Sequence, residues 1–177
     1  MITKQFKLSI ELVPSTIWYA NIYKYYRKLN QMEKWHELKQ HLFETEGNNC
    51  WICNKNERNL EVHEFWEYDD YNHIQKLKAI HHICDLCHKI KHIGLWCHTS
   101  EGQVKLKKHG LTREALINHF CNVNGCTSDD FLKHEEIAFK KYSRRSKFQW
   151  KQDLGMYDPK YGLKVLKSQQ KLQAIEI

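Results

Sequence analysis

Two Cys-x-x-Cys pairs constrain the fold of this chain more than any other feature of its sequence. The first pair is Cys50 and Cys53, and the second is Cys84 and Cys87. A tight turn at each pair can direct both sulfur atoms at one ion, and four thiolates complete a tetrahedral zinc shell. Such a shell has no open position, so the sequence predicts a structural Zn²⁺ that ties two separate segments together.

A dithiol redox pair is the alternative, but it requires a single Cys-x-x-Cys at the start of a helix in a βαβ pattern. The chain has seven cysteines, an odd number that excludes a fully paired disulfide framework. Cys97, Cys121 and Cys126 stand outside the pattern, and we expect ordinary buried thiols there. Free thiols predict a reducing compartment, and we expect the protein to be cytoplasmic.

Composition limits the classes of protein that remain. The chain has 177 residues, of which 41% are hydrophobic, enough for one globular domain with a core. No apolar run approaches the ~20 residues that span a bilayer, so no membrane partner is expected. The formal net charge is +7. A basic surface suits a polyanion such as nucleic acid, although charge alone does not identify the partner.

Hydrophobic periodicity predicts a strand and a helix in the N-terminal part. Residues 3–12 alternate apolar and polar side chains, which favours a strand. Residues 31–46 have helical spacing and are followed by Gly47, a common residue just past a helix end. Between these segments Tyr19, Tyr23 and Tyr26 also have helical spacing. We expect them to pack on the core rather than to stack on bases.

The remaining segments predict an α+β fold. Strands are expected over residues 60–65 and 74–83, joined by the loop 66–72, with a short helix over 88–92 that stops at Gly94. Two longer helices are expected over residues 112–123 and 128–154. The tail 155–177 is rich in lysine and glutamine and is expected to be frayed or a loosely attached helix.

Histidines accompany the cysteine pairs. His88 and His92 are four residues apart, so one helix face can present both imidazoles to one metal ion. His63 lies in the first of the two strands, with Glu64 beside it. The ββα-metal layout consists of two strands and a helix, with metal ligands on the first strand and on the helix. In this layout a divalent ion holds a scissile phosphate. The adjacent His81 and His82 are expected to be surface or packing residues.

The residues Leu60-Glu-Val-His63-Glu64, followed by Cys84-Asp-Leu-Cys87-His88-Lys-Ile-Lys-His92, resemble the HNH endonuclease superfamily. The strand motif, from His63 to Asp69, is similar to that of small stand-alone bacterial and phage members with a built-in four-cysteine zinc knuckle. The resemblance covers residues 50–94. It implies a zinc-clasped ββα-metal core over residues 48–96, flanked by 1–47 and 97–154 with 155–177 as a basic tail, all in a single domain. It also implies hydrolysis of DNA phosphodiester bonds.

The resemblance implies a role for individual residues. His63, His88 and His92 would hold a catalytic divalent ion, which could be Mg²⁺, Mn²⁺, Ni²⁺ or Zn²⁺. The family's general-base position holds Glu64, a weaker base near neutral pH than histidine. The catalytic set is therefore expected to be Glu64, His63 and His88.

One landmark of the family is missing, because its middle asparagine falls on Ala79. Several residues could fill the gap. His63 could itself be the base, with Glu61, Asp69 or Asp70 reaching the metal, or the loop could contribute Asn72 and His73. The sequence leaves these alternatives open.

Five cations near the end of the 128–154 segment exceed what the negative end of a helix dipole needs. We expect them to bind the backbone of DNA, double-stranded DNA being favoured; they are Lys140, Lys141, Arg144, Arg145 and Lys147. A first alternative is a non-catalytic zinc-binding DNA-recognition or adaptor protein derived from HNH enzymes, which Ala79 and Glu64 support. A second is an RNA nuclease or RNA-binding module, and the sequence does not indicate an oligomeric state.

Overall fold

A computed structural model describes residues 5–158 and residue 160, and shows mixed α and β structure. The chain forms two compact units, each built from segments that are far apart in the sequence. The first, called the cysteine unit, is the described part of residues 1–15, 48–61 and 82–147. The second, called the sheet unit, is the described part of residues 16–47, 62–81 and 148–177. The sequence predicted a single domain with consecutive blocks, and the structure instead interleaves the segments.

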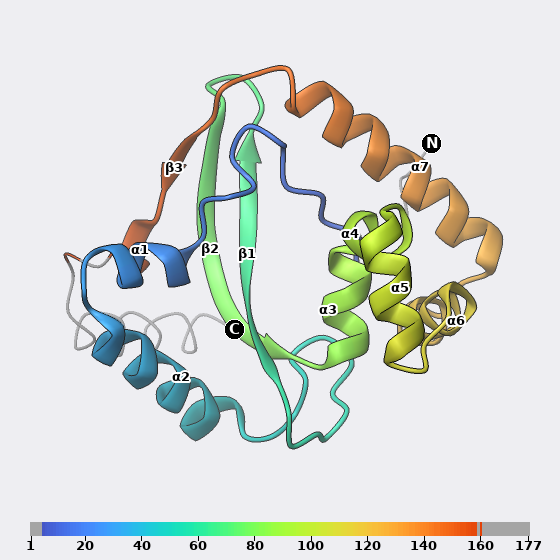
Figure 1. The fold of residues 1–177 in the computed structure, drawn as a ribbon, viewed down its shortest axis with the longest axis horizontal. Helices are drawn as coiled ribbons and strands as arrows, with labels where there is room; N and C mark the ends of the chain where they lie inside the picture. Colours follow the sequence, from blue (N-terminus) through green and yellow to red (C-terminus); the bar gives the residue numbers. More distant parts are fainter. Residues whose placement is uncertain (1–4, 159, 161–177) are drawn as a thin grey trace. The chain divides into compact units, whose positions relative to one another are not determined.

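The second cysteine pair lies at the start of the first of five helices in the cysteine unit (Figure 1). They are α3 (Asp85–Lys91), α4 (Ile93–Cys97), α5 (Ser100–Lys108), α6 (Arg113–Asn124) and α7 (Ser128–Arg145). Helix α3 packs against α6, α4 against α5, and α6 against α7. Fully buried side chains from α3, α4, α6 and α7 form their core, among them Ile90, Ile93, Leu116, Phe120 and Phe131.

Local sequence explains where these helices begin. The side chains of Thr99, Thr112 and Thr127 each accept a backbone N–H bond at a helix start, and Thr127 forms a capping box with Asp130. The prediction of α6 is confirmed. The short helix was expected to stop at Gly94, but α4 continues through it, and α5 was not predicted.

The described part of the N-terminal segment forms neither a helix nor a strand, and it pairs with no strand in the described part of the chain. Its backbone is held by side chains: Leu8 exchanges two hydrogen bonds with Asn124, and the N–H of Ile10 donates to His134 Nε2 at 3.0 Å. The alternation that suggested a strand is real, since Leu8 and Ile10 are buried. Helices supply the hydrogen-bond partners that a neighbouring strand would have provided.

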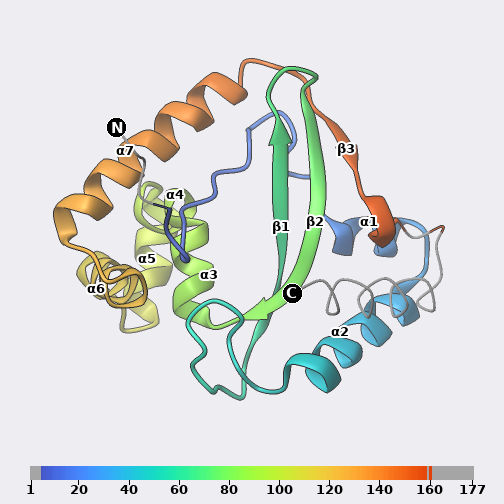
Figure 2. The ribbon, with the colours of Figure 1, turned by 180° about the vertical axis from the view of Figure 1, so that it is seen from behind.

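Two helices and three strands build the sheet unit (Figures 1 and 2). They are α1 (Ile22–Lys28), α2 (Met32–Glu46), β1 (Glu61–Asp69), β2 (Ile74–Ile83) and β3 (Lys151–Asp153), followed by the 3₁₀ turn η1 (Gly155–Tyr157). The strand order is β1-β2-β3, and β3 runs parallel to β2 with Gln75 opposite Gln152. The predicted helix over 128–154 is therefore too long, because α7 ends at Arg145 and the chain then forms β3.

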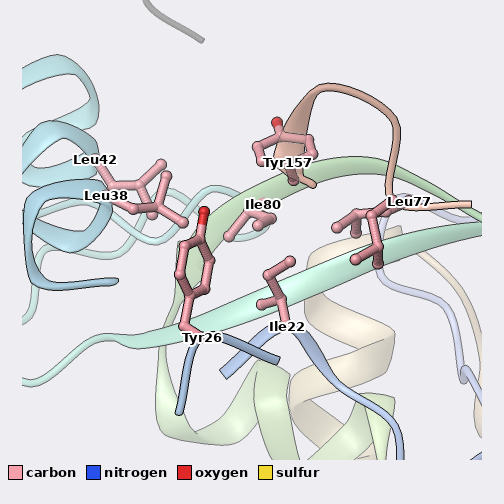
Figure 3. Close-up of a cluster of buried hydrophobic side chains, with 8 residues drawn as sticks. Ile22, Tyr26, Leu38, Leu42, Leu77, Ile80 and Tyr157 are labelled. Carbon is pink, nitrogen blue, oxygen red and sulfur yellow. The ribbon is translucent and has the colours of Figure 1, made fainter. Parts of the chain in front are cut away.

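A cluster of apolar side chains forms the core of the sheet unit (Figure 3). Helices α1 and α2, strand β2 and the C-terminal turn each contribute to it: Ile22, Tyr26, Leu38, Leu42, Leu77, Ile80, Leu154 and Tyr157. From β1, Val62 and Trp66 pack against this cluster. Even-numbered residues of β1 thus face the core of the sheet unit. Across the described residues, no helix combines the length and the apolar character needed to cross a membrane.

Candidate metal centre

The four cysteines of the two pairs come together in the cysteine unit. Their sulfur atoms all lie within 4.8 Å of one another, and those of Cys53 and Cys84 are 3.6 Å apart. A tetrahedral zinc site with Zn–S bonds of about 2.3 Å places its sulfurs roughly 3.8 Å apart. All four thiols are free, and three of them are buried. The cluster can therefore hold a structural metal such as zinc.

Backbone hydrogen bonds shape the first pair. The N–H of Cys50 donates to the carbonyl of Lys55, and the N–H of Asn54 donates back to the carbonyl of Cys50. Asn54 has φ of 61°, a left-handed conformation that asparagine tolerates better than most residues. The N–H of Trp51 donates to the carbonyl of His82, which joins this turn to the end of β2. The turn is thus held next to Cys84.

The second pair begins helix α3. Cys84 is its N-cap residue with extended dihedral angles, and Cys87 lies in its first turn. The N–H of His88 donates to the carbonyl of Cys84, so His88 is fixed directly behind the cluster.

The electrostatics of the cluster favour a cation. Hydrogen bonds from Cys84 and Cys87 hold the pKa of the Cys50 thiol far below its ordinary value. The contact with Cys50 raises the pKa of Cys84 to about 12, and it also raises that of Cys87 well above its ordinary value. Without a metal ion, the four sulfur atoms favour a single thiolate. A divalent cation bound among them stabilises several thiolates at once.

His88 and His92 lie side by side next to this cluster. Their ring centroids are 4.9 Å apart, and the rings are nearly perpendicular, at 86°. The Nδ1 atom of His88 lies 3.1 Å from Oε2 of Glu61, the first residue of β1. A carboxylate on one ring nitrogen fixes the orientation of an imidazole and leaves the other nitrogen for a ligand. This pair therefore has the chemistry of a partial metal site.

The structure places His63 and Glu64 on opposite faces of β1, because side chains alternate along a strand. His63 belongs to the sheet unit, is buried, and contacts the ring of Phe65 at 5.3 Å on its own face of the strand. The Oε1 atom of Glu64 accepts the backbone N–H of Ile22 at 2.5 Å, at the first residue of α1. The carboxylate of Glu64 thus hydrogen-bonds the start of a helix on the face of β1 opposite His63, and its role as a general base stays a prediction.

The residues of the β1–β2 turn that were considered as further metal-site residues take part in other contacts. Asp69 accepts hydrogen bonds from Tyr71 and from the backbone and side chain of Asn72, which shape the turn between β1 and β2. His73 is stacked on Phe148 with centroids 4.2 Å apart. Asp69 lies six positions beyond His63, or about 20 Å along β1. Glu61, by contrast, contacts His88 of the histidine pair.

The cations predicted to bind DNA lie at the end of α7 and just beyond it. Lys140, Lys141, Arg144 and Lys147 are exposed, while Arg145 is partly buried. Lys140 pairs with Glu136 one turn earlier, an exposed contact of little energetic weight. The exposed cations give this end of α7 a positive surface.

Sequence reasoning missed one residue at the cysteine cluster. His119, in α6, has its Nε2 atom 3.2 Å from Sγ of Cys87. No local pattern indicates this contact, because the two residues lie on different helices.

Comparison with known proteins gives no match. No protein-family model matches the chain, and no curated protein or solved structure is significantly similar to it.

Proposed function

We propose that this protein is a metal-dependent nuclease of the HNH type that hydrolyses DNA phosphodiester bonds, and that its four-cysteine cluster holds a structural zinc ion. The observation that carries the proposal is the pair His88 and His92 directly behind the cysteine cluster, with Glu61 at the Nδ1 atom of His88. Two adjacent imidazoles with an orienting carboxylate are the usual surroundings of a catalytic metal.

His63 completes the proposed ligand set. It is two residues beyond Glu61 on β1 and projects from the same face of that strand, because the side-chain period is two. The resemblance to HNH enzymes, which implies His63, His88 and His92 as the ligands of one ion, supports this assignment. In this proposal His63, His88 and His92 hold a divalent ion, and Glu61 orients His88.

When bound, such an ion offsets the phosphate charge of the transition state and lowers the pKa of water toward neutrality. The protein's own contribution is to fix the ligands. The cysteine cluster holds the backbone of His88, and burial restricts His63. Glu64 has no catalytic role here, since its carboxylate binds the start of α1. The cations of α7 and Lys147 are proposed to bind the DNA backbone.

The experiment that tests this function is a cleavage assay with one variant and one matched control. Wild-type protein, supplied in turn with Mg²⁺, Mn²⁺, Ni²⁺ and Zn²⁺, is incubated with plasmid DNA, single-stranded DNA and RNA. We expect His88→Ala to abolish cleavage while zinc content and DNA affinity stay unchanged. The control His36→Ala removes an exposed histidine of α2 and should cleave normally.

A non-catalytic DNA-binding adaptor is the second candidate. The observation that favours it is the structural role of Glu64 at the family's general-base position, together with Ala79 at the asparagine position. If wild-type protein binds DNA but cuts no nucleic acid with any of the four ions, the adaptor replaces the nuclease.

A further inference from the structure

Three large aromatic side chains are exposed at the start of the sheet unit. The exposed fractions of Trp18, Tyr19 and Tyr23 are 64%, 60% and 40%. By contrast, Ile22 and Tyr26 of α1, the helix that contains Tyr23, are buried in the core shown in Figure 3. Of the three tyrosines with helical spacing, only Tyr26 packs as expected. The apolar side of α1 is already covered, so the exposed rings need another explanation.

Three cations follow these rings along the chain. Lys24 Nζ donates to the carbonyl of Tyr19 at 2.9 Å and lies 6.0 Å from the ring centroid of Trp18. Arg27 and Lys28 are exposed in the last turn of α1. Within the described residues, neither forms an ion pair with a carboxylate. These two cations lie on the same short helix as the exposed ring of Tyr23.

We propose that this surface, here called the aromatic patch, binds unpaired bases of single-stranded nucleic acid; its residues are Trp18, Tyr19, Tyr23, Lys24, Arg27 and Lys28. Aromatic rings provide stacking platforms for bases, and neighbouring cations follow the phosphates. A duplex hides its base faces, so the patch selects single strands or unpaired nucleotides. An edge contact with Trp35, at 5.6 Å and 70°, holds the Tyr23 ring in place before any ligand binds.

An anionic membrane surface also attracts aromatic and basic residues, but the patch suits it poorly. Membrane-surface helices present a continuous apolar face opposite a charged one. In α1 the apolar side chains Ile22 and Tyr26 are buried, and the exposed residues are one ring, that of Tyr23, and three cations. The helix has only seven residues, so little apolar surface remains to enter a lipid layer.

The patch adds a binding activity to the proposed nuclease and does not depend on it. The nuclease proposal concerns the histidines and the cations near the end of α7. Binding by the patch needs no catalytic ion. Anisotropy measurements without added divalent ions therefore test the patch even if the protein cuts nothing.

The test uses the full zinc-loaded chain and a fluorescein-labelled oligothymidylate. Replacing Trp18 and Tyr19 together by alanine should raise the Kd by about 10-fold or more, because each stacked base contributes roughly 1–3 kcal/mol. Affinity for duplex DNA should change less than about twofold. Replacing both residues by phenylalanine keeps the rings and should keep the affinity.

The matched control is Tyr71→Ala, which removes a ring that is 91% exposed but stands beside Asp70. This variant should bind oligothymidylate like the wild type. The proposal is overturned if the double alanine variant binds oligothymidylate as tightly as the wild type. It is also overturned if Tyr71→Ala loses as much oligothymidylate affinity as the double alanine variant. Loss of binding to vesicles of phosphatidylserine and phosphatidylcholine, with oligothymidylate binding intact, would instead assign the patch to membranes.

Discussion

The Nε2 atom of His119, in α6, lies 3.2 Å from the Sγ atom of Cys87, in α3. Burial lowers the pKa of His119, so its imidazole is neutral near pH 7. A neutral ring with its proton on Nε2 donates to a thiolate, which offers only acceptor sites. Residues of this kind, which hydrogen-bond a metal ligand without touching the metal, help to set metal affinity.

We therefore expect His119→Ala to weaken zinc binding by about 10- to 100-fold without removing the site. Competition with a chromophoric chelator measures the affinity. His109→Ala, at an exposed histidine of the same unit, should leave it unchanged. Equal affinities in the wild type and the His119 variant would mean that the contact only packs α6 against α3.

The zinc site itself leads to a second prediction. We expect about one tightly held zinc per chain after extensive dialysis, measured by elemental analysis. Cys84→Ser should abolish cooperative unfolding of the cysteine unit, because a structural zinc supplies folding free energy. The matched substitution Cys121→Ser alters a thiol outside the cluster and should keep the metal. A folded wild-type protein with less than about half an equivalent of zinc would refute the site.

The sequence predicted the cysteine cluster because the signal for it lies within two short segments of the chain. Each Cys-x-x-Cys turn brings its own two sulfurs together, and tetrahedral geometry then requires the second pair. The contact of His119 with Cys87 has no such signal. It depends on the packing of α6 against α3, which no spacing encodes.

The same distinction explains the errors in the fold. Caps and hydrophobic spacing predicted α2 and α6 closely, because these signals are contained within each segment. Residues 5–15 satisfied the strand pattern, yet they form no strand, and Asn124 and His134 bind the backbone of Leu8 and Ile10. Strand β3 was missed since it has three residues and depends on pairing with a partner strand far away in the sequence.

The opposite faces of β1 give a third prediction. Glu64→Gln should keep cleavage, because its side chain lies on the face of α1, whereas His63→Ala should abolish it. Glu64→Ala should lower the free energy of unfolding by about 1–3 kcal/mol, because the start of α1 loses a charged hydrogen-bond partner. Chemical denaturation and the cleavage assay measure the two effects separately. Loss of cleavage in a fully folded Glu64→Gln protein would restore Glu64 as the base.

A fourth prediction concerns the cations at the end of α7. Neutralising Arg144 and Arg145 with glutamine should weaken duplex DNA binding and reduce the slope of log Kd against log salt by about one per lost phosphate contact. The control pair Lys107→Gln and Lys108→Gln, exposed on α5, has the same change in net charge and should keep the slope. Equal slopes in both variants would place the DNA contacts elsewhere.

The last prediction concerns acid stability and His134. Its Nε2 atom accepts the N–H of Ile10, which requires an unprotonated nitrogen, and burial, with the charges of Lys141 and Lys91, lowers its pKa. The unfolded chain therefore binds this proton more readily than the folded chain. Below the unfolded value of about 6.5, the free energy of unfolding should fall as the pH falls, by at most about 1.4 kcal/mol per pH unit for this one group. His134→Gln keeps an acceptor for Ile10 but does not titrate, so its stability should fall less steeply between about pH 6.5 and 5. Urea denaturation of both proteins with excess zinc measures the difference, and parallel curves would show that His134 does not contribute to acid sensitivity.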